Sequence, residues 1–257
     1  MARATILGAT ILALSAAMTA CVIISGATAQ TTTVGTVPDY AALIAAADRT
    51  DADRETDKRR DPAKLLAFTG VRTGEKVLDM GAGRGYSTEL LARAVGPGGV
   101  VYGQNAPDLS ERGKAAFEER TKTPAGKPIV ALARPFDDPL PPDVRDLDLV
   151  TFFFFYHDTT YMPVDRALMN RKLFAALKPG AFLVIADHSA KEGAGATVGK
   201  SLHRIEESTV RSEVEAAGFK LVAEGDFLRH PEDTRDFSMQ PPTKPADEFV
   251  LKFQKPQ

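Results

Sequence analysis

Three alternate glycines, Gly81, Gly83 and Gly85, interrupt an apolar run two residues after an acid, Asp79, and a helix-like stretch follows them. Because glycines lack a Cβ atom, they allow a tight turn and let a ligand lie against bare backbone. The N–H groups at the start of the following helix would point at that ligand. A dinucleotide-binding loop would carry its third glycine at position 86, where this chain has Tyr86,. The loop therefore predicts a site for a nucleotide-like cofactor other than a dinucleotide.

Three of the four histidines follow stretches that are expected to be strands. His157 lies in "YHDTT", His188 lies in "ADHS", and His203 begins "HRIEE". An imidazole can take or give a proton at neutral pH, and Asp158 or Asp187 could orient it. The alternative is that each histidine is a polar residue at the rim of a site and has no chemical role.

Strand-like and helix-like stretches alternate from Lys76 onward, which is typical of a parallel sheet covered by helices on both faces,. The last two strand-like stretches have no helix between them and predict an antiparallel last strand. We therefore predict an α/β fold with a Rossmann-like, open, mostly parallel seven-stranded sheet. The expected strands are residues 76–80, 100–104, 128–133, 147–156, 181–187, 220–228 and 248–254.

Ligands of open parallel sheets bind beyond the carboxyl ends of the strands, where the strand order reverses. The glycine loop and the histidines follow strands, so the sequence places them at that edge. The run Phe152 to Phe155 belongs to the expected fourth strand, and burial on both faces of the sheet explains it,. An aromatic wall for a substrate is the alternative.

The segment "VLDMGAGRG" resembles the first motif of class I S-adenosylmethionine-dependent methyltransferases. The strand order, the "LKPGAFLVI" approach to the fifth strand and the antiparallel last strand resemble the same family, over about residues 60–257. More narrowly, "RRDPAKLLAFTGVRTGEKVLDMGAGRGY", "FFFFYHD" and "LHRIEESTVRSEVEAAGF" are similar to a group of exported, predicted bacterial methyltransferases.

This resemblance implies S-adenosyl-L-methionine as the cofactor. It assigns cofactor contacts to Gly81, Ala82, Gly83 and Gly85, and it implies that Asp79 faces the amino-acid end of the cofactor. The alternative for Asp79 is a carboxylate that only ties down the loop.

The end of the second strand departs from the family pattern. The family usually has Asp or Glu there to accept both ribose hydroxyls, whereas this chain has Gln104 and Asn105. An amide oxygen still accepts such a bond but lacks the charge that strengthens it. After the third strand, Asp137 or Asp138 matches the position that often contacts the adenine amino group, and a turn at Asp138 is the alternative,.

Methyl transfer requires an acceptor in line with the sulfonium, and a base if the acceptor is a protonated oxygen or nitrogen. His157 is the first candidate base, with Asp158 or Asp187 orienting it, and His188 is the second. Tyr156 is expected to stack on cofactor or substrate. No tight spacing such as H-x-x-x-H occurs, so the sequence predicts no metal site, although these histidines and acids are possible ligands,.

The amino terminus has the pattern of an export signal. Arg3 is the only charged side chain in residues 1–29, an apolar stretch covers residues 6–24, and small residues precede Gln30. This predicts a secretory signal cleaved before Gln30, and hence a periplasmic or secreted protein. An uncleaved membrane anchor and a lipoprotein attached through Cys21 are the alternatives.

The predicted domains are therefore a signal peptide at 1–29, a helical extension at 30–60 and a methyltransferase domain at 61–257. Cys21 is the only cysteine, so the cleaved chain would have no disulfide and no cysteine nucleophile,.

The net charge of −2 and the scattered Lys and Arg residues exclude the usual footprint of a nucleic-acid binder,. A small-molecule substrate is expected, with no membrane contact beyond the export signal or anchor, and the oligomeric state is left open.

The leading hypothesis is an S-adenosylmethionine-dependent methyltransferase acting on a small acceptor. The alternative is a non-catalytic protein that binds a nucleoside or metabolite on the same fold. A hydrolase is disfavoured because no G-x-S-x-G elbow occurs,.

Overall fold

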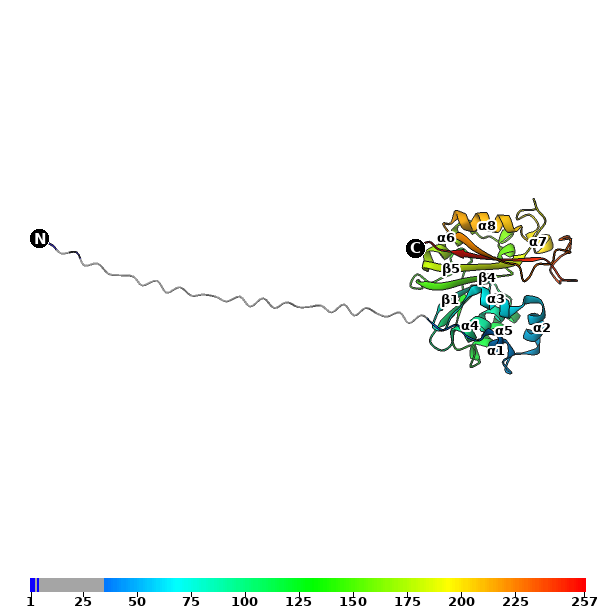
Figure 1. The fold of residues 1–257 in the computed structure, drawn as a ribbon, viewed down its shortest axis with the longest axis horizontal. Coiled ribbons are helices and arrows are strands. Elements are labelled where there is room, and N and C mark those ends of the chain that lie inside the picture. The colour runs from blue at the N-terminus through cyan, green and yellow to red at the C-terminus, as the bar shows by residue number, and fades with distance from the viewer. Residues whose placement is uncertain (3, 5–34) are drawn as a thin grey trace. The chain divides into compact units, whose positions relative to one another are not determined.

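The computed structural model describes residues 1, 2, 4 and 35–257 (Figure 1). The predicted signal peptide, its cleavage before Gln30 and the lipidation at Cys21 lie outside the described residues. Within residues 35–257, no helix is both long and apolar enough to cross a membrane.

A seven-stranded sheet lies at the centre of residues 35–257, with strand order β3-β2-β1-β4-β5-β7-β6. β1 to β5 run parallel, and β7 runs antiparallel to both of its neighbours. The predicted α/β class, the mostly parallel seven-stranded sheet and the antiparallel last strand are confirmed. The strands are β1 (Lys76–Met80), β2 (Val100–Asn105), β3 (Ile129–Ala133), β4 (Leu147–Phe153), β5 (Leu177–His188), β6 (Lys220–Gly225) and β7 (Glu248–Gln254).

Helices cover both faces of the sheet (Figure 1). Side chains alternate between the faces along each strand, so Leu78 of β1 joins the core on one side and Val77 joins the core on the other,. The first core includes α6 and α8, and the second includes α3, α4 and α5. These helices are α3 (Pro62–Thr69), α4 (Tyr86–Val95), α5 (Glu111–Lys122), α6 (Arg166–Ala176) and α8 (Glu207–Ala216).

Two further helices precede α3, namely α1 (Tyr40–Ala45) and α2 (Asp51–Arg60). α2 begins with acids and ends with Lys58, Arg59 and Arg60, an order that suits the helix dipole,. Asp61 then adopts a left-handed conformation with φ 37°, which ends α2, and Pro62 begins α3. Residues 51–69 therefore form two helices with a sharp break at Asp61.

The phenylalanine run does not continue the fourth strand as the sequence predicts. β4 ends at Phe153, and Phe154 adopts φ 58°, which turns the chain out of the sheet. A 3₁₀ helix, η1 (Tyr156–Thr160), follows directly. The expected strand to residue 156 is wrong, because the left-handed residue turns Phe155 away from the strand direction.

Candidate active site

The glycine loop follows β1 at the edge of the sheet where the strand order reverses. Gly81, Gly83 and Gly85 all have positive φ, at 64°, 56° and 83°. Gly85 is the N-cap of α4. A Cβ atom at Gly83 would meet nothing closer than the Gly81 carbonyl oxygen at 3.9 Å, so this part of the backbone is bare. The loop thus has the conformation that its sequence predicts.

The amide side chains at the end of β2 are hydrogen-bonded to this loop. Asn105 Oδ1 accepts from the Gly83 N–H at 2.7 Å, and Asn105 Nδ2 donates to the Gly83 carbonyl at 3.2 Å. Gln104 Oε1 accepts from the Gly81 N–H at 3.2 Å, while Gln104 Nε2 donates to the Arg134 carbonyl at 2.7 Å. Both amides therefore close the loop onto β2, and Asn105 also lines a cavity of about 260 Å³ beside α5.

Asp79 is buried beneath the loop, with 1% of its surface exposed. It is paired with Thr151 in the β1–β4 register, so the two side chains share one face of the sheet,. The hydroxyls of Thr88 and Thr151 donate to its two carboxylate oxygens at 2.6 and 2.7 Å. Desolvation raises the pKa of Asp79 to about 6, against the lowering effect of these hydrogen bonds.

Phe155 covers the start of the loop. Its Cγ would lie 2.8 Å from a Cβ atom at Gly81, so only glycine fits at that position. Phe155 also stacks on Phe136 with ring centroids 5.1 Å apart. The Ala82 N–H donates to the Gln104 carbonyl at 2.9 Å, so this residue also holds the loop against β2.

The two acids after β3 are bound to neighbouring segments. Asp138 forms ion pairs with Arg134 and with Lys172, and the hydrogen bond from Lys172 is the main cause of its lowered pKa. Asp137 Oδ2 accepts from the backbone N–H of Asp165 at 3.3 Å.

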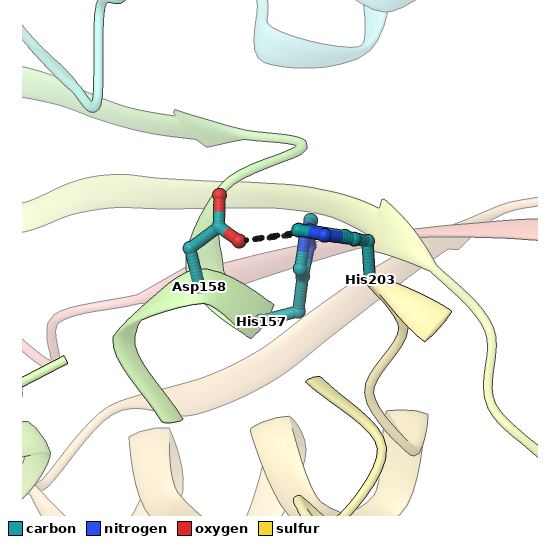
Figure 2. Close-up of side chains that lie close together, drawn as sticks. All are labelled: His157, Asp158 and His203. Carbon is teal, nitrogen blue, oxygen red and sulfur yellow. Dashed lines mark hydrogen bonds and ion pairs between the residues drawn. The ribbon is translucent and has the colours of Figure 1, made fainter. Parts of the chain in front are cut away.

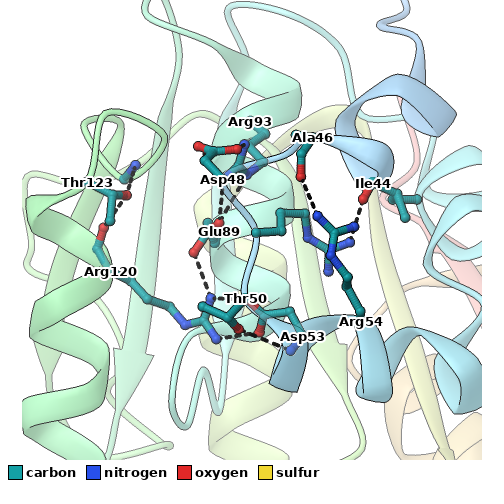
Figure 3. Close-up of polar contacts among 12 residues, drawn as sticks. Ile44, Ala46, Asp48, Thr50, Asp53, Arg54, Glu89, Arg93, Arg120 and Thr123 are labelled. Carbon is teal, nitrogen blue, oxygen red and sulfur yellow. Dashed lines mark hydrogen bonds and ion pairs between the residues drawn. The ribbon is translucent and has the colours of Figure 1, made fainter.

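An ionic network fixes α2 beside the loop (Figure 3). Arg120 of α5 donates to Asp53 of α2 at 2.6 Å and to Glu89 of α4 at 2.6 Å. Its Nε also donates to the Arg84 carbonyl in the glycine loop at 2.7 Å. Arg93 extends the network from Glu89 to Asp48. One guanidinium thus connects the loop to three helices.

His157 and Asp187 form a buried pair after β4 and β5. His157 Nδ1 lies 2.7 Å from Asp187 Oδ1, and the backbone N–H of His157 donates to Asp187 Oδ2 at 2.8 Å. Desolvation lowers the pKa of His157, but the carboxylates of Asp187 and Asp158 outweigh it and raise this pKa to about 10. The imidazole is therefore a cation at neutral pH.

Asp158 and His203 lie next to this pair (Figure 2). Asp158 Oδ1 is 3.2 Å from His157 Nε2 and 3.1 Å from His203 Nδ1, and it also accepts from the Tyr161 hydroxyl. His203 comes from the end of α7 (Gly199–Leu202), 45 residues along the chain from Asp158. The fold thus brings His203, which the sequence places at the same edge of the sheet, into contact with Asp158.

His188 has the opposite electrostatic environment. Burial lowers its pKa to about 3, so the imidazole is neutral at neutral pH. Its Nδ1 lies 2.8 Å from Glu248 Oε1, although it has no aligned hydrogen-bond partner in the described part of the chain. Desolvation raises the pKa of Glu248 to about 8. A protonated Glu248 carboxyl can turn its proton toward the neutral imidazole of His188. We interpret the 2.8 Å between Oε1 and Nδ1 as this contact.

Tyr156 lies apart from the other predicted catalytic residues. It is fully buried, donates to Glu213 Oε2 at 2.8 Å and accepts from Asn170 Nδ2 at 2.8 Å. Its ring belongs to the core on the α6 and α8 side of the sheet. The structure therefore brings Asp158 and His188 together around the ring of His157, but not Tyr156.

Several polar groups at this edge carry no recognisable sequence signal. Glu248 reaches His188 because the two are register partners in the β5–β7 pair. Arg60 at the end of α2 lies over the ring of Phe154 at 4.4 Å, and desolvation lowers its pKa to about 10. β5 and β7 are far apart in the sequence, so the local sequence around either strand does not show that they pair.

A cavity of about 700 Å³ opens between α2 and the segment that precedes β7. Its wall includes Lys58, Arg59, Lys244, Glu55 and Glu248. Glu248 thus belongs both to this cavity and to the group around His188.

The model of the protein-L-isoaspartate(D-aspartate) O-methyltransferase family matches residues 54–127, which run from within α2 through the glycine loop and α5. A protein-L-isoaspartate O-methyltransferase of Aeropyrum pernix is 44% identical over 57 residues, or 22% of each chain. A demethylmenaquinone methyltransferase of Staphylococcus carnosus is 34% identical over 129 residues, or 49% of this chain and 48% of that protein. The chain thus matches only about a fifth and about half of these relatives' lengths.

Among solved structures, a SAM-dependent methyltransferase from Aquifex aeolicus superimposes with a TM-score of 0.57 at 21% identity. The match covers 80% of this chain and all of that chain. The chain therefore has the fold of class I S-adenosylmethionine-dependent methyltransferases.

Proposed function

We propose that this protein is an S-adenosylmethionine-dependent methyltransferase acting on a small, anionic acceptor. The observation that carries the proposal is the glycine loop: three left-handed glycines after β1, with a buried acid before them, on a methyltransferase fold. Left-handed glycines leave backbone that a cofactor can approach, and Gly83, unlike Gly81 and Gly85, has no crowding neighbour that would require a glycine,.

The residues present fit this cofactor at the backbone of the loop. Gly83 is bare, and the first turn of α4 offers N–H groups at its positive end,. Gly81, Gly83, Gly85 and Asn105 would hold the cofactor, after Asn105 exchanges its bonds to Gly83 for bonds to a ribose hydroxyl. When bound, the cofactor supplies an electrophilic methyl group on a sulfonium ion. The chain's own task is then to admit, hold and orient the acceptor.

The charge of the cavity beside α2 favours an anionic acceptor. Its volume of about 700 Å³ suits a small molecule,. Lys58 in its wall pairs with Glu55, and Arg59 lies 3.8 Å from Glu248, whose pKa burial raises to about 8, so that it is largely protonated. Arg59 and Lys244 therefore exceed the ionised acids of the wall. This surplus of cations would attract a negatively charged molecule.

The two buried histidines support the same choice. General base catalysis works best with a pKa near the working pH. His157 has a pKa raised to about 10 and already holds its proton, while His188 has a pKa lowered to about 3 and binds a proton weakly. Neither imidazole is suited to deprotonate an acceptor. An acceptor that is ionised in solution, such as a carboxylate or an enolate, needs no base.

Titration of the purified protein with S-adenosylmethionine and S-adenosylhomocysteine by calorimetry tests cofactor binding. Transfer of a labelled methyl group to a panel of small carboxylates, enolates and amines tests the acceptor. We expect binding of both nucleosides and transfer to anionic acceptors. An absence of heat at millimolar ligand would remove the enzyme proposal.

The second candidate is a binding protein that has lost catalysis, and the amide side chains of β2 favour it. Gln104 and Asn105 replace the usual acid and close the loop in this structure. Heat of binding with other nucleosides, but none with S-adenosylmethionine, would support this candidate.

We further propose export of the protein through its amino-terminal segment. Sequencing the amino terminus of the protein made in its own host tests this. Gln30 as the first residue would indicate soluble export, a lipidated Cys21 would indicate an anchor, and Met1 would exclude cleavage.

A further inference from the structure

Three potential metal-ligating atoms converge beside η1. His157 Nε2, Asp158 Oδ1 and His203 Nδ1 all lie within 4.8 Å of one another. The two distances to the carboxylate oxygen are 3.2 and 3.1 Å. Ligands of a tetrahedral zinc ion, bound at 2.0–2.1 Å, are separated by about 3.3 Å. The carboxylate and each imidazole are thus already spaced like two corners of that tetrahedron.

The imidazole of His157 is oriented as in metal sites. Its second nitrogen, Nδ1, is held by Asp187 Oδ1 at 2.7 Å, so Nε2 points toward Asp158. A carboxylate behind a histidine is the usual second partner of a zinc-bound imidazole, because it fixes the ring and strengthens the ligand. Asp187 is itself fully buried and also accepts from the backbone N–H groups of His157 and His188.

The backbone around His203 is built to bring it to this place. α7 packs so closely on η1 that a Cβ atom at Gly199 would lie 2.1 Å from Thr160 Oγ1 and 2.7 Å from the His157 carbonyl oxygen. His203 itself has φ 52°, a conformation unusual for a residue with a side chain,. The next residue, Arg204, is fully buried and pairs with Asp233 at 2.8 Å. These features fix the third ligand from both sides.

We propose that His157, Asp158 and His203 form a binding site for one divalent transition-metal ion, with Asp187 as the supporting carboxylate (Figure 2). Two imidazoles and one carboxylate suit Zn²⁺, Co²⁺ or Ni²⁺, whereas Mg²⁺ and Ca²⁺ prefer oxygen ligands. Three protein ligands leave a fourth position for water or a small ligand. The proposed site departs from the prediction of no metal site, which rested on the absence of closely spaced ligands in the sequence. The fold brings these three ligands together from separate segments.

A metal-free hydrogen-bond network is the competing explanation. It requires His157, His203 and the Tyr161 hydroxyl to donate together to the one oxygen Asp158 Oδ1. A carboxylate oxygen offers about two lone pairs, so three donors crowd it. A cation in place of the two imidazole protons would relieve this crowding and retain the Tyr161 bond.

Metal titration of the full chain tests the proposal without any assay of methyl transfer. The tag-free protein is treated with chelator, dialysed, and titrated with Zn²⁺ by calorimetry and with Co²⁺ by visible absorption. We expect one ion per chain, a tetrahedral Co²⁺ spectrum, a rise in melting temperature on binding, and no response to Mg²⁺. His203→Gln and Asp158→Asn should each weaken binding by about 100-fold or more, and Asp187→Asn by about 10- to 100-fold.

His230→Gln is the matched control, because His230 is the remaining histidine and its side chain pairs with Glu232, 3.3 Å away at the surface. Its affinity for Zn²⁺ should equal that of the unchanged protein. Circular dichroism shows whether each variant folds, and the use of two ligand variants keeps the test valid if one of them unfolds. Failure of the unchanged protein to bind Zn²⁺ or Co²⁺ would overturn the proposal and leave the hydrogen-bond network. Full affinity in a folded His203→Gln or Asp158→Asn variant would overturn it as well.

Discussion

Replacement of Asp79 by Asn should stabilise the protein at neutral pH. Asp79 is almost completely buried, and two threonine hydroxyls are its only side-chain hydrogen-bond partners within residues 35–257. Burial raises its pKa from 3.8 to about 6. An acid with a raised pKa binds its proton more tightly in the folded state, so stability falls as the pH rises from 3.8 to about 6 and stays level above,.

The size of the effect follows from the shift. A difference of about 2 pKa units corresponds to about 3 kcal/mol at pH 7 and to roughly half of that at pH 5. Asn carries no charge, and its amide can accept from one threonine and donate to the other. In a domain of this size, about 3 kcal/mol raises the melting temperature by roughly 6–12 °C.

Urea unfolding of both proteins at pH 7 and pH 5 measures the difference. The advantage of Asp79→Asn should shrink at the lower pH, and the exposed Asp108→Asn variant should change stability by no more than about 0.5 kcal/mol at either,. If Asp79 also faces the cofactor, the stabilised variant should bind S-adenosylmethionine more weakly. A lower free energy of unfolding for Asp79→Asn at pH 7 would refute the burial argument.

Three further substitutions probe the loop and its supports. Gly83→Val should abolish S-adenosylmethionine binding in a calorimetric titration, and undiminished binding would place the pocket elsewhere. Its φ of 56° strains a β-branched residue and lowers stability, but a Cβ atom there meets nothing closer than 3.9 Å, so we expect the protein to fold, which circular dichroism checks,. Asn105→Asp should tighten S-adenosylmethionine binding by about fivefold, because a charged acceptor strengthens a hydrogen bond by about 1 kcal/mol, and an unchanged Kd would contradict a role in ribose binding. Arg120→Met should lower the free energy of unfolding by about 3–5 kcal/mol in urea titrations, since it leaves the buried Asp53 carboxylate without its ion pair while Glu89 keeps Arg93, and a neutral result would mean that water replaces the guanidinium,.

The sheet and the glycine loop were predictable from the sequence because both depend on local patterns. β1 and β7 have the predicted bounds, since apolar runs mark their ends directly. The turn at Phe154 was not predictable. Four identical aromatic residues contain no signal for a left-handed conformation, and only the packing of Phe155 on Gly81 and Phe136 gives it a reason.

The polar site was predictable as a set of residues but not as a set of contacts. His157 and His188 follow strands, so topology alone brings them to one edge. Against the effect of burial, the carboxylates of Asp187 and Asp158 raise the pKa of His157, whereas burial lowers that of His188. Glu248, which lies against His188, belongs to a strand 60 residues further along the chain. The sequence pattern predicts which side chains lie near a strand end. The burial and ion pairing that determine the pKa values of these side chains depend on the whole fold.

The amide at position 105 links the closed loop to the chemistry proposed for it. Asn105 accepts from the Gly83 N–H and donates to the Gly83 carbonyl, and a carboxylate could make only the first of these bonds,. A carboxylate at position 105 would leave the Gly83 carbonyl without a donor and would repel its oxygen. The loop would then be held less tightly, and the carboxylate would be free to accept from a ribose hydroxyl. With asparagine, a cofactor must first displace two hydrogen bonds, each worth about 1 kcal/mol, before it gains its own. For the proposed cofactor, we therefore expect asparagine at position 105 to lower the affinity in two ways. It stabilises the cofactor-free protein, and it makes a weaker hydrogen bond to the ribose in the complex.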